Sequence, residues 1–256
     1  MKYPQIERLI EIVATLRGDN GCQWDREQTH KSLRPNMLEE AYEAVDAIDD
    51  NDIVNLREEL GDVLLQVVLH AQIAKDEGNF DIEDVAKDLG DKLIHRHPHV
   101  FGDTKVNSTK DILDAWDKLK KEEKINRKSV LDGISKSQSA LMSAQKISKK
   151  VVKVGFEWDS EESLKKCIQS EYKEFEEAVQ LGEMDKMEDE MGDIFSATVN
   201  LARWHKIDAE QALLRANKKF TKRFKKMEEI AEKPLEEYSY KEFDTLWKRA
   251  KILTKD

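Results

Sequence analysis

Apolar residues recur at intervals of three and four along most of the chain, which is the spacing of one face of an α-helix. In the first half, two such segments run through Leu38, Ala41, Val45 and Ile48, and then through Leu60, Val63, Leu64, Val67, Val68 and Ala71. In the second half, a similar segment contains Met191, Ile194, Phe195, Thr198, Val199 and Leu201. Because strand-like alternation is rare, the pattern predicts an all-α fold in which these helices form the buried centre.

The apolar pattern belongs to a longer internal repeat. Gly21-Cys22-Gln23-Trp24-Asp25 matches Gly155-Phe156-Glu157-Trp158-Asp159, and at the same offset Glu40 and Glu43 match Glu174 and Glu177. At a slightly shorter offset, Glu59 and Asp62 match Glu190 and Asp193, and Trp116 matches Trp247. Lys92 and Arg96 match Lys219 and Arg223 in the same order. A fixed order of matches indicates duplication. We therefore predict two homologous helical units, residues 1–125 and 126–256, with the boundary near Asn126.

Local signals refine the expected helices. Asp25 and Asp159 each precede a helical run and have Gln28 and Glu162 three positions later, which predicts N-terminal caps of the capping-box type. Gly61 and its counterpart Gly192 lie inside the most apolar helices, where glycine costs about 1 kcal/mol relative to alanine. Their repetition predicts that another helix or a ligand approaches closely at this point.

Composition agrees with a soluble helical protein. The 256 residues include only four prolines and ten glycines, and 38% are charged. Two cysteines cannot form a disulfide framework, which favours a reducing cytosol. The amphipathic start of the chain has no signal-peptide core, and no apolar run is long enough to cross a membrane, so we expect a cytoplasmic protein. A net charge of −10 argues against stable nucleic-acid binding.

The acidic pairs are the strongest chemical signal. A single Glu-x-x-Glu pair would be an ordinary solvated helix face, but here two pairs lie on apolar helices and occur twice, where unpaired charges are costly. Clustered carboxylates favour a hard cation, and Mg²⁺ is usual where phosphate completes the coordination. A di-iron bundle needs Glu-x-x-His from two helices. Glu27 and His30 form such a pair, but the equivalent residues of the second unit are Glu161 and Leu164. The second Glu-x-x-His is therefore missing, which argues against a di-iron site.

Cationic residues that could bind phosphate accompany the acidic pairs. Lys219 and Arg223 are four positions apart and can contact one polyphosphate together. Lys92 and Arg96 repeat this spacing in the first unit. Trp247 and Trp116 could stack on a base or close the core, and the sequence leaves both interpretations open.

At these residues the chain resembles the MazG family of nucleoside triphosphate pyrophosphohydrolases over nearly its whole length. The first unit carries Glu39-Glu40-x-x-Glu43 with Glu59-x-x-Asp62, the Gly-Cys-Gln-Trp-Asp segment and His95-Arg96-His97-Pro98-His99-Val100-Phe101. The second carries Ala140-Leu141-Met142, Ala144-Gln145-Lys146-Ile147, Gly155-Phe156-Glu157-Trp158-Asp159 and the run ending at Arg223. The acidic pairs alone would also fit dimeric dUTPases and dCTPases.

The resemblance implies a homodimer of helix bundles that hydrolyses nucleoside triphosphates to monophosphate and pyrophosphate with Mg²⁺, or with Mn²⁺ as an alternative cation. It implies catalytic roles for Glu39, Glu43 and Glu177. The implied metal ligands are Glu40, Glu43, Glu59 and Asp62 in the first unit and Glu174, Glu177, Glu190 and Asp193 in the second. The implied substrate contacts are Ser170, Glu171, Tyr172, Lys173, Glu174, Lys186, Met187, Glu188, Asp189, Asp193, Lys219, Phe220, Thr221, Lys222, Arg223 and Trp247, with Lys92 and Arg96 in the first unit.

One position departs from the family pattern. At the offset that pairs Glu40 with Glu174, the leading Glu39 of the first motif corresponds to Lys173 in the second unit. If that Glu orients the attacking water, the second unit is impaired; if not, Lys173 could contact phosphate. The richer basic helix favours the second unit as the main nucleotide site. A narrower set of deoxynucleotide or damaged substrates, and a non-catalytic helical interaction protein, remain alternatives.

Overall fold

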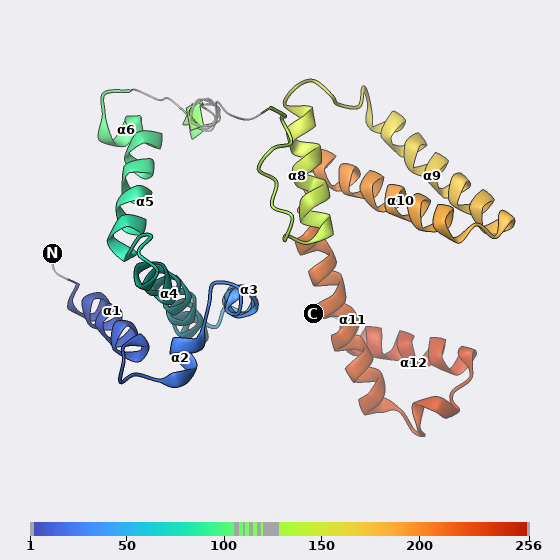
Figure 1. Ribbon diagram of the computed structural model, residues 1–256. Helices are drawn as coiled ribbons and strands as arrows, with labels where there is room; N and C mark the ends of the chain where they lie inside the picture. Colours follow the sequence, from blue (N-terminus) through green and yellow to red (C-terminus); the bar gives the residue numbers. More distant parts are fainter. Residues whose placement is uncertain are drawn as a thin grey trace. The chain divides into compact units, whose positions relative to one another are not determined.

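The computed structural model describes residues 3–104, 108–109, 111–112, 115–116, 119 and 128–254. Every regular element within these ranges is a helix, which confirms the predicted all-α class (Figure 1). The chain divides into two compact units, Met1–Ile125 and Asn126–Asp256. The boundary expected near Asn126 falls outside the described residues. Within the described part of the chain, no helix is long and apolar enough to cross a membrane.

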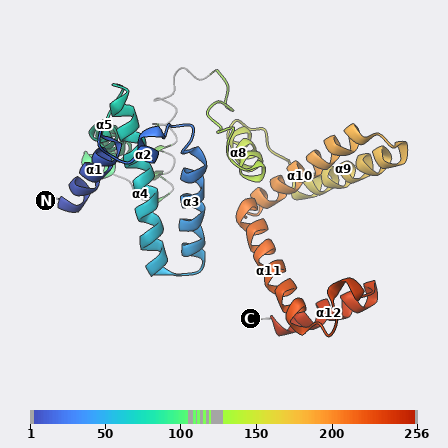
Figure 2. The same ribbon diagram turned by 60° about the horizontal axis from the view of Figure 1, so that its bottom comes forward.

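The first unit is built around a helical hairpin. Its helices are α1 (Pro4–Arg17), α2 (Gln23–Glu27), α3 (Arg34–Asp49), α4 (Ile53–Asp76), α5 (Ile82–Arg96) and α6 (Pro98–Phe101). Helices α3 and α4 lie side by side (Figure 2). The core joins α1 to the start of α3 and the second half of α4 through Val13, Leu33, Val68, Leu69 and Ile73. This core therefore anchors one end of the hairpin and leaves the turn end free.

The second unit repeats the hairpin and adds a C-terminal helix. Its elements are α8 (Ala140–Val152), α9 (Glu161–Leu181), α10 (Met184–Trp204), α11 (Ala209–Ile230), the 3₁₀ turn η1 (Leu235–Glu237) and α12 (Tyr240–Leu253). The buried amide of Gln145 on α8 donates to the Ile207 carbonyl (2.6 Å) and accepts from the Ala209 amide (3.0 Å). Helix α8 thus fixes the junction of α10 and α11, while α12 packs on the far end of α11 around Met227, Leu246 and Ala250.

The two hairpins correspond position by position. Helix α4 begins at Ile53 and helix α10 at Met184, which differ by the same offset as Glu59 and Glu190. The turn before each contains a residue in the left-handed backbone region, Asn51 (φ 55°) and Gly182 (φ 71°), again at this offset. Asparagine and glycine are the residues that adopt this conformation most readily. The same turn therefore connects both pairs of helices.

The expected caps are not the ones that the structure uses. Helix α2 begins at Gln23, so Asp25 lies within it rather than before it. Helix α9 is capped by Ser160, whose hydroxyl accepts from the Ser163 amide (3.2 Å). Asp159 instead accepts a short hydrogen bond from the Ser163 hydroxyl. The predicted cap of α9, Asp159, is therefore one position away from the actual cap, Ser160. The predicted cap Asp25 is wrong, because it lies inside α2.

Each hairpin keeps an apolar face that the described residues of its own unit leave exposed. Equivalent exposed positions in the two hairpins are Ile48 (55%) and Val179 (48%), Ile53 (73%) and Met184 (71%), and Leu64 (37%) and Phe195 (58%). On α4 burial is concentrated in the second half, whereas near the turn only small residues such as Ala44, Ala47 and Ala178 are buried among the described positions of α3 and α9. A Cβ added to Gly61 or Gly192 would meet nothing within 4 Å among the described residues. The expected close approach at these glycines is therefore not made by the described residues of either unit.

The start of α12 gives a pH-dependent prediction. The Glu242 carboxylate accepts from the Ser239 amide (2.8 Å) and from Lys233 Nζ (2.9 Å). These bonds, the backbone one first, lower the pKa of Glu242 from 4.5 to about 2. A carboxylate whose pKa is lower in the folded than in the unfolded protein stabilises the fold at any pH above its unfolded-state pKa. This stabilisation is lost as the pH falls from the unfolded-state pKa through the folded-state pKa. Glu242→Gln should therefore lower the melting temperature at pH 7, and the difference should vanish between pH 4.5 and about 2. A difference that stays constant over this range would contradict the assignment.

Candidate functional site

Three carboxylates meet on the α3–α4 hairpin of the first unit. Glu40 and Glu43 lie one turn apart on α3, and Glu59 faces them from α4. One oxygen of each side chain lies within 4.8 Å of the others. Asp62, one turn beyond Glu59, is close enough that its charge raises the pKa of both Glu40 and Glu59. The structure therefore brings together the four acidic residues expected in this unit.

The second unit has a matching group, but with one different member. Glu171 and Glu174 on α9 and Glu190 on α10 lie within 4.8 Å of one another. The charge of Asp193 contributes to the raised pKa of Glu190, so this residue also lies nearby. Glu177, expected as a ligand, lies one turn beyond Glu174 and is not in the group that the described structure forms. We therefore replace Glu177 by Glu171 in the candidate site.

The geometry corrects the alignment of the two copies. Glu40, Glu43, Glu59 and Asp62 correspond to Glu171, Glu174, Glu190 and Asp193 at one constant offset. The Gly21 and Gly155 segments are related by a longer offset than the acidic residues. The offset between the two copies therefore changes before α3, and not between α3 and α4 as the sequence alignment assumed. The informative signal was the spacing from Glu40 to Glu59, which equals that from Glu171 to Glu190.

The corrected alignment changes the partner of Glu39. Ser170, not Lys173, occupies its position in the second unit, and Lys173 occupies that of Tyr42. The Ser170 hydroxyl donates to a Glu174 oxygen (3.1 Å). Glu39 itself is exposed and adds to the negative charge around Glu40. The first unit therefore has a fifth carboxylate where the second has a neutral hydroxyl.

The electrostatics of both groups favour a bound cation. The pKa of Glu40, of Glu59 and of Glu190 is raised in each case by desolvation first and then by neighbouring carboxylates. Mutual repulsion of this kind is relieved when a cation binds between the charges. A donor set made only of carboxylate oxygens suits Mg²⁺ or Mn²⁺. The residues present therefore fit a divalent metal site in each unit.

The predicted substrate residues of the second unit fall into two separate regions. Lys186, Met187, Glu188 and Asp189 occupy the first turns of α10 beside the acidic group, and Lys186 pairs with Glu183 (2.5 Å). The basic run Lys219–Arg223 lies on α11, where the Phe220 ring contacts Trp247 of α12 (centroids 5.2 Å apart). As far as the chain is described, α11 leaves the end of α10 opposite the α9–α10 turn and runs away from the hairpin (Figures 1 and 2).

Trp247 and Trp116, which could each stack on a base or close the core, both have ring contacts. Trp247 packs against the apolar cluster of α11 and α12 as well as against Phe220, which favours the core role for part of its surface. Trp116 lies edge-on to His97 (4.9 Å between centroids). His97 ends α5, and its Nδ1 lies 2.6 Å from the Leu93 carbonyl. Lys92 and Arg96 lie on the last turns of the same helix.

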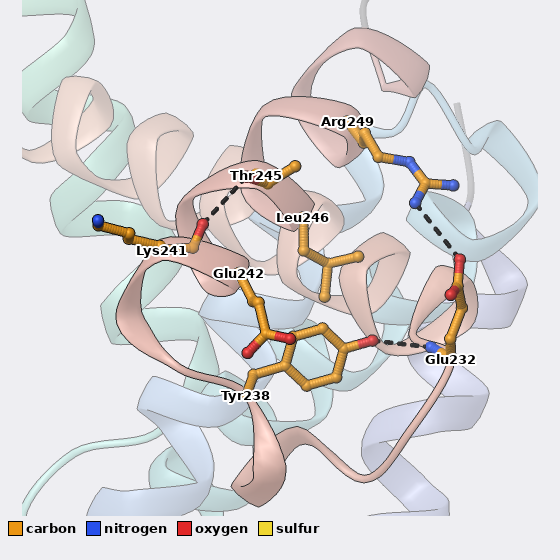
Figure 3. A pocket seen from close by; sticks show the side chains of 7 residues that line it. All are labelled: Glu232, Tyr238, Lys241, Glu242, Thr245, Leu246 and Arg249. Carbon is orange, nitrogen blue, oxygen red and sulfur yellow. Dashed lines mark hydrogen bonds and ion pairs between the residues drawn. The ribbon is translucent and has the colours of Figure 1, made fainter.

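A pocket of about 280 Å³ in the second unit lies elsewhere and has no predicted site residue (Figure 3). It lies beside α12 and is lined by Glu232, Tyr238, Lys241, Glu242, Thr245, Leu246 and Arg249. Several of its polar groups bind one another: the Tyr238 hydroxyl accepts from the Glu232 amide (2.8 Å), and Arg249 pairs with the Glu232 carboxylate (3.7 Å). The acidic groups, in contrast, lie on open helix faces.

Sequence reasoning missed one further side chain at the site. Cys167 lies one turn before Glu171 on α9 and donates its thiol hydrogen to Glu171 Oε1 (3.4 Å). From the sequence alone, Cys167 is only one of two cysteines that are too few for a disulfide framework. The corrected alignment reveals its place, because only then does Glu171 become a member of the acidic group.

The chain is similar to several known proteins. The family model of the MazG nucleotide pyrophosphohydrolase domain matches residues 28–101 and 159–228. The chain is 46% identical to the nucleoside triphosphate pyrophosphohydrolase/pyrophosphatase MazG of Thermotoga maritima, over 96% of this chain and 95% of that protein. It is 44% identical to the nucleoside triphosphate pyrophosphohydrolase of Escherichia coli K12, over 88% of each. A crystal structure of a MazG-related protein from Thermotoga maritima matches with a TM-score of 0.40 and 32% identity, covering 45% of this chain and 98% of that one.

Proposed function

Since the chain belongs to the MazG nucleotide pyrophosphohydrolase family and is a nucleoside triphosphate pyrophosphatase, we propose that it cleaves these substrates between the α- and β-phosphorus atoms with Mg²⁺. The products are a nucleoside monophosphate and pyrophosphate. The observation that carries the proposal is the pair of three-carboxylate groups, which lie at equivalent positions within the two regions matched by the family.

The carboxylates of each hairpin would hold the cation. In the first unit these are Glu40, Glu43, Glu59 and Asp62, and in the second Glu171, Glu174, Glu190 and Asp193. A divalent cation bound there supplies charge neutralisation for the phosphates and an activated water. Mn²⁺ has similar ligand preferences and would substitute.

The residues around each group divide the remaining roles. In the first unit Glu39 would orient the attacking water or accept its proton. In the second unit the Ser170 hydroxyl can position Glu174 but cannot take up a proton at neutral pH. Lys219 and Arg223 would stabilise negative charge on the leaving pyrophosphate, and Trp247 beside Phe220 would contact the base with its exposed surface.

We also propose that a second copy of the chain completes the site. In the second unit α11, which carries the basic run, runs away from the hairpin that carries the acidic group. The described residues of each unit also leave an apolar face of its hairpin exposed. Two hairpins packed face to face would form a four-helix bundle, which buries such faces. A homodimer of this kind would also fill the space beside Gly61 and Gly192.

Because Cys22 and Cys167 are both free thiols, we place the enzyme in the cytoplasm.

The proposal predicts the products and the metal requirement. Purified protein with a nucleoside triphosphate and Mg²⁺ should release pyrophosphate and monophosphate in equal amounts, without orthophosphate. A chelator should abolish this release, and Mg²⁺ or Mn²⁺ should restore it. Enzyme-coupled pyrophosphate detection with chromatography of the nucleotides measures both products, and a panel of bases and sugars run in parallel reports the preference. Orthophosphate as the first product, or full activity in the chelator, would refute the proposal.

A further inference from the structure

Two histidine rings meet at the end of the first hairpin that the core anchors. His30 lies in the turn before α3, and His70 lies on the second half of α4. The rings are nearly parallel (3° between planes, centroids 5.0 Å apart), and their Nδ1 atoms are 2.7 Å apart. Two Nδ1 atoms form a hydrogen bond only when one carries a hydrogen and the other does not. The contact therefore requires at least one neutral imidazole.

This contact ties the segment between α2 and α3 to α4. Within the segment, the amides of Thr29 and Ser32 each donate to the hydroxyl of the other (3.0 and 3.1 Å). Leu33, at the end of the segment, is buried in the core. His30 holds the middle of the segment against α4, directly before the helix that carries Glu40 and Glu43.

The second unit has no such pair at the equivalent positions. Leu164 corresponds to His30 at the longer offset, and Leu201 corresponds to His70 at the offset of the acidic residues. Leu164 is fully buried. His205 of this unit instead lies 3.3 Å from the Glu161 carboxylate, and a proton on this ring strengthens that contact. Acid should therefore weaken a histidine contact in the first unit and strengthen one in the second.

The elements around the pair carry further charged groups, several of which are neutralised in pairs. Arg17 of α1 pairs with Asp76 of α4 (2.8 Å), and Lys75 of α4 pairs with Asp81 before α5 (3.4 Å). The charge that acts on His70 is that of His30. The other charged side chains in the adjoining segments are Glu27 on α2, Lys31 in the turn and Arg34 at the start of α3.

We propose that the His30–His70 contact (the histidine latch) is a pH-sensitive joint, which holds the start of α3 to α4 at neutral pH and releases it in acid. A first proton on the exposed His30 ring leaves its Nδ1–H free to donate to Nδ1 of the half-buried His70. The second proton must then occupy His70 Nδ1. That step breaks the hydrogen bond and leaves two positive rings side by side.

The direction of the pH effect follows from His70. Burial first, and then the charge of His30, lowers the pKa of His70 below its usual 6.5. A histidine with a lowered pKa in the closed state stabilises that state at a pH above its usual pKa, and this stabilisation is lost as the pH falls through the lowered value. The latch should therefore be closed at pH 7.5 and open progressively below pH 6.5.

Hydrogen–deuterium exchange of the full-length protein at pH 7.5 and pH 5.5 tests the latch. Rates are divided by those of the unfolded chain at the same pH, because chemical exchange itself depends on pH. Peptides from residues 28–40 and 63–75 should lose protection by about 3-fold or more at the lower pH, relative to the equivalent peptides of the second unit. The double variant His30→Leu with His70→Leu, which copies the second unit, should abolish this loss. His95→Gln, a change of an exposed histidine on α5, should retain it.

Two further measurements keep the test independent of how well the double variant folds. His70→Gln retains a hydrogen-bonding side chain that cannot take up a proton, and it should also abolish the loss of protection. In protein with ¹⁵N-labelled histidines, the His70 ring should titrate at a higher pH in His30→Leu than in the unchanged protein, because the neighbouring charge is gone. An equal loss of protection in His70→Gln and the unchanged protein, or no loss in the unchanged protein, would overturn the proposal. So would a His70 titration that His30→Leu does not move.

Discussion

The double substitution Glu43→Gln with Glu174→Gln is expected to lower pyrophosphate release by about 100-fold or more, because each change removes one charge from a three-carboxylate group. Glutamine keeps the size of the side chain and removes the anionic oxygen that the cation needs. Initial rates with a nucleoside triphosphate and saturating Mg²⁺ measure the effect. The two single variants show how the activity is divided between the units.

The matched control for this experiment is Glu43→Gln with Glu177→Gln. Glu177 lies on the same helix as Glu174 and was the ligand expected from the longer offset, but it is not in the group. This control should retain the rate of Glu43→Gln alone. Calorimetric titration with Mn²⁺ compares the effects of Glu174→Gln and Glu177→Gln on metal binding directly. This comparison holds even if only the first unit hydrolyses the substrate. Loss of a binding site with Glu177→Gln but not with Glu174→Gln would show that the correspondence of Glu43 with Glu174 is wrong.

Replacing Leu64 and Phe195 together by aspartate is expected to convert the proposed dimer into monomers and to abolish most activity. Each side chain would otherwise bury apolar surface worth about 1.5 kcal/mol or more, so the pair weakens association by about 100-fold at the least. Both equivalent positions are changed so that neither hairpin can hold the partner alone. Light scattering coupled to size-exclusion chromatography measures the mass.

Ile252→Asp provides the control for this surface. Ile252 is also a largely exposed apolar residue (68%), but it lies on α12, outside both hairpins. The variant should keep the mass and activity of the unchanged protein. If the unchanged protein is a monomer with full activity, the second copy is not needed to complete the site.

The hairpins could be predicted well because the signals for them lie in short stretches of the sequence. Periodic apolar residues and a repeat in fixed order identify α3, α4, α9 and α10 without knowledge of the tertiary structure. What covers an apolar face is not local information. The pattern on α4 cannot distinguish Leu69, which packs inside the unit, from Leu64, which is exposed.

The ligands predicted for the second unit differ from the acidic group in the structure for a specific geometric reason. Glu171, Glu174 and Glu177 are spaced three apart on α9, so two overlapping Glu-x-x-Glu pairs lie on nearly the same stripe. Only the position of Glu190 on α10 decides which pair meets the second helix. The prediction that Asp25 caps a helix was also wrong, because α2 already begins at Gln23.

The turn that contains Asn51 or Gly182 has a consequence for how the molecule folds. Each three-carboxylate group is drawn from one short stretch of chain, 40–59 or 171–190, which this one turn divides. Contacts between residues so near in sequence have a low entropic cost of closure and form early. The carboxylates should therefore approach one another while the rest of each unit is still unfolded. A divalent cation present at that stage would offset their repulsion and could speed folding as well as serve the finished site.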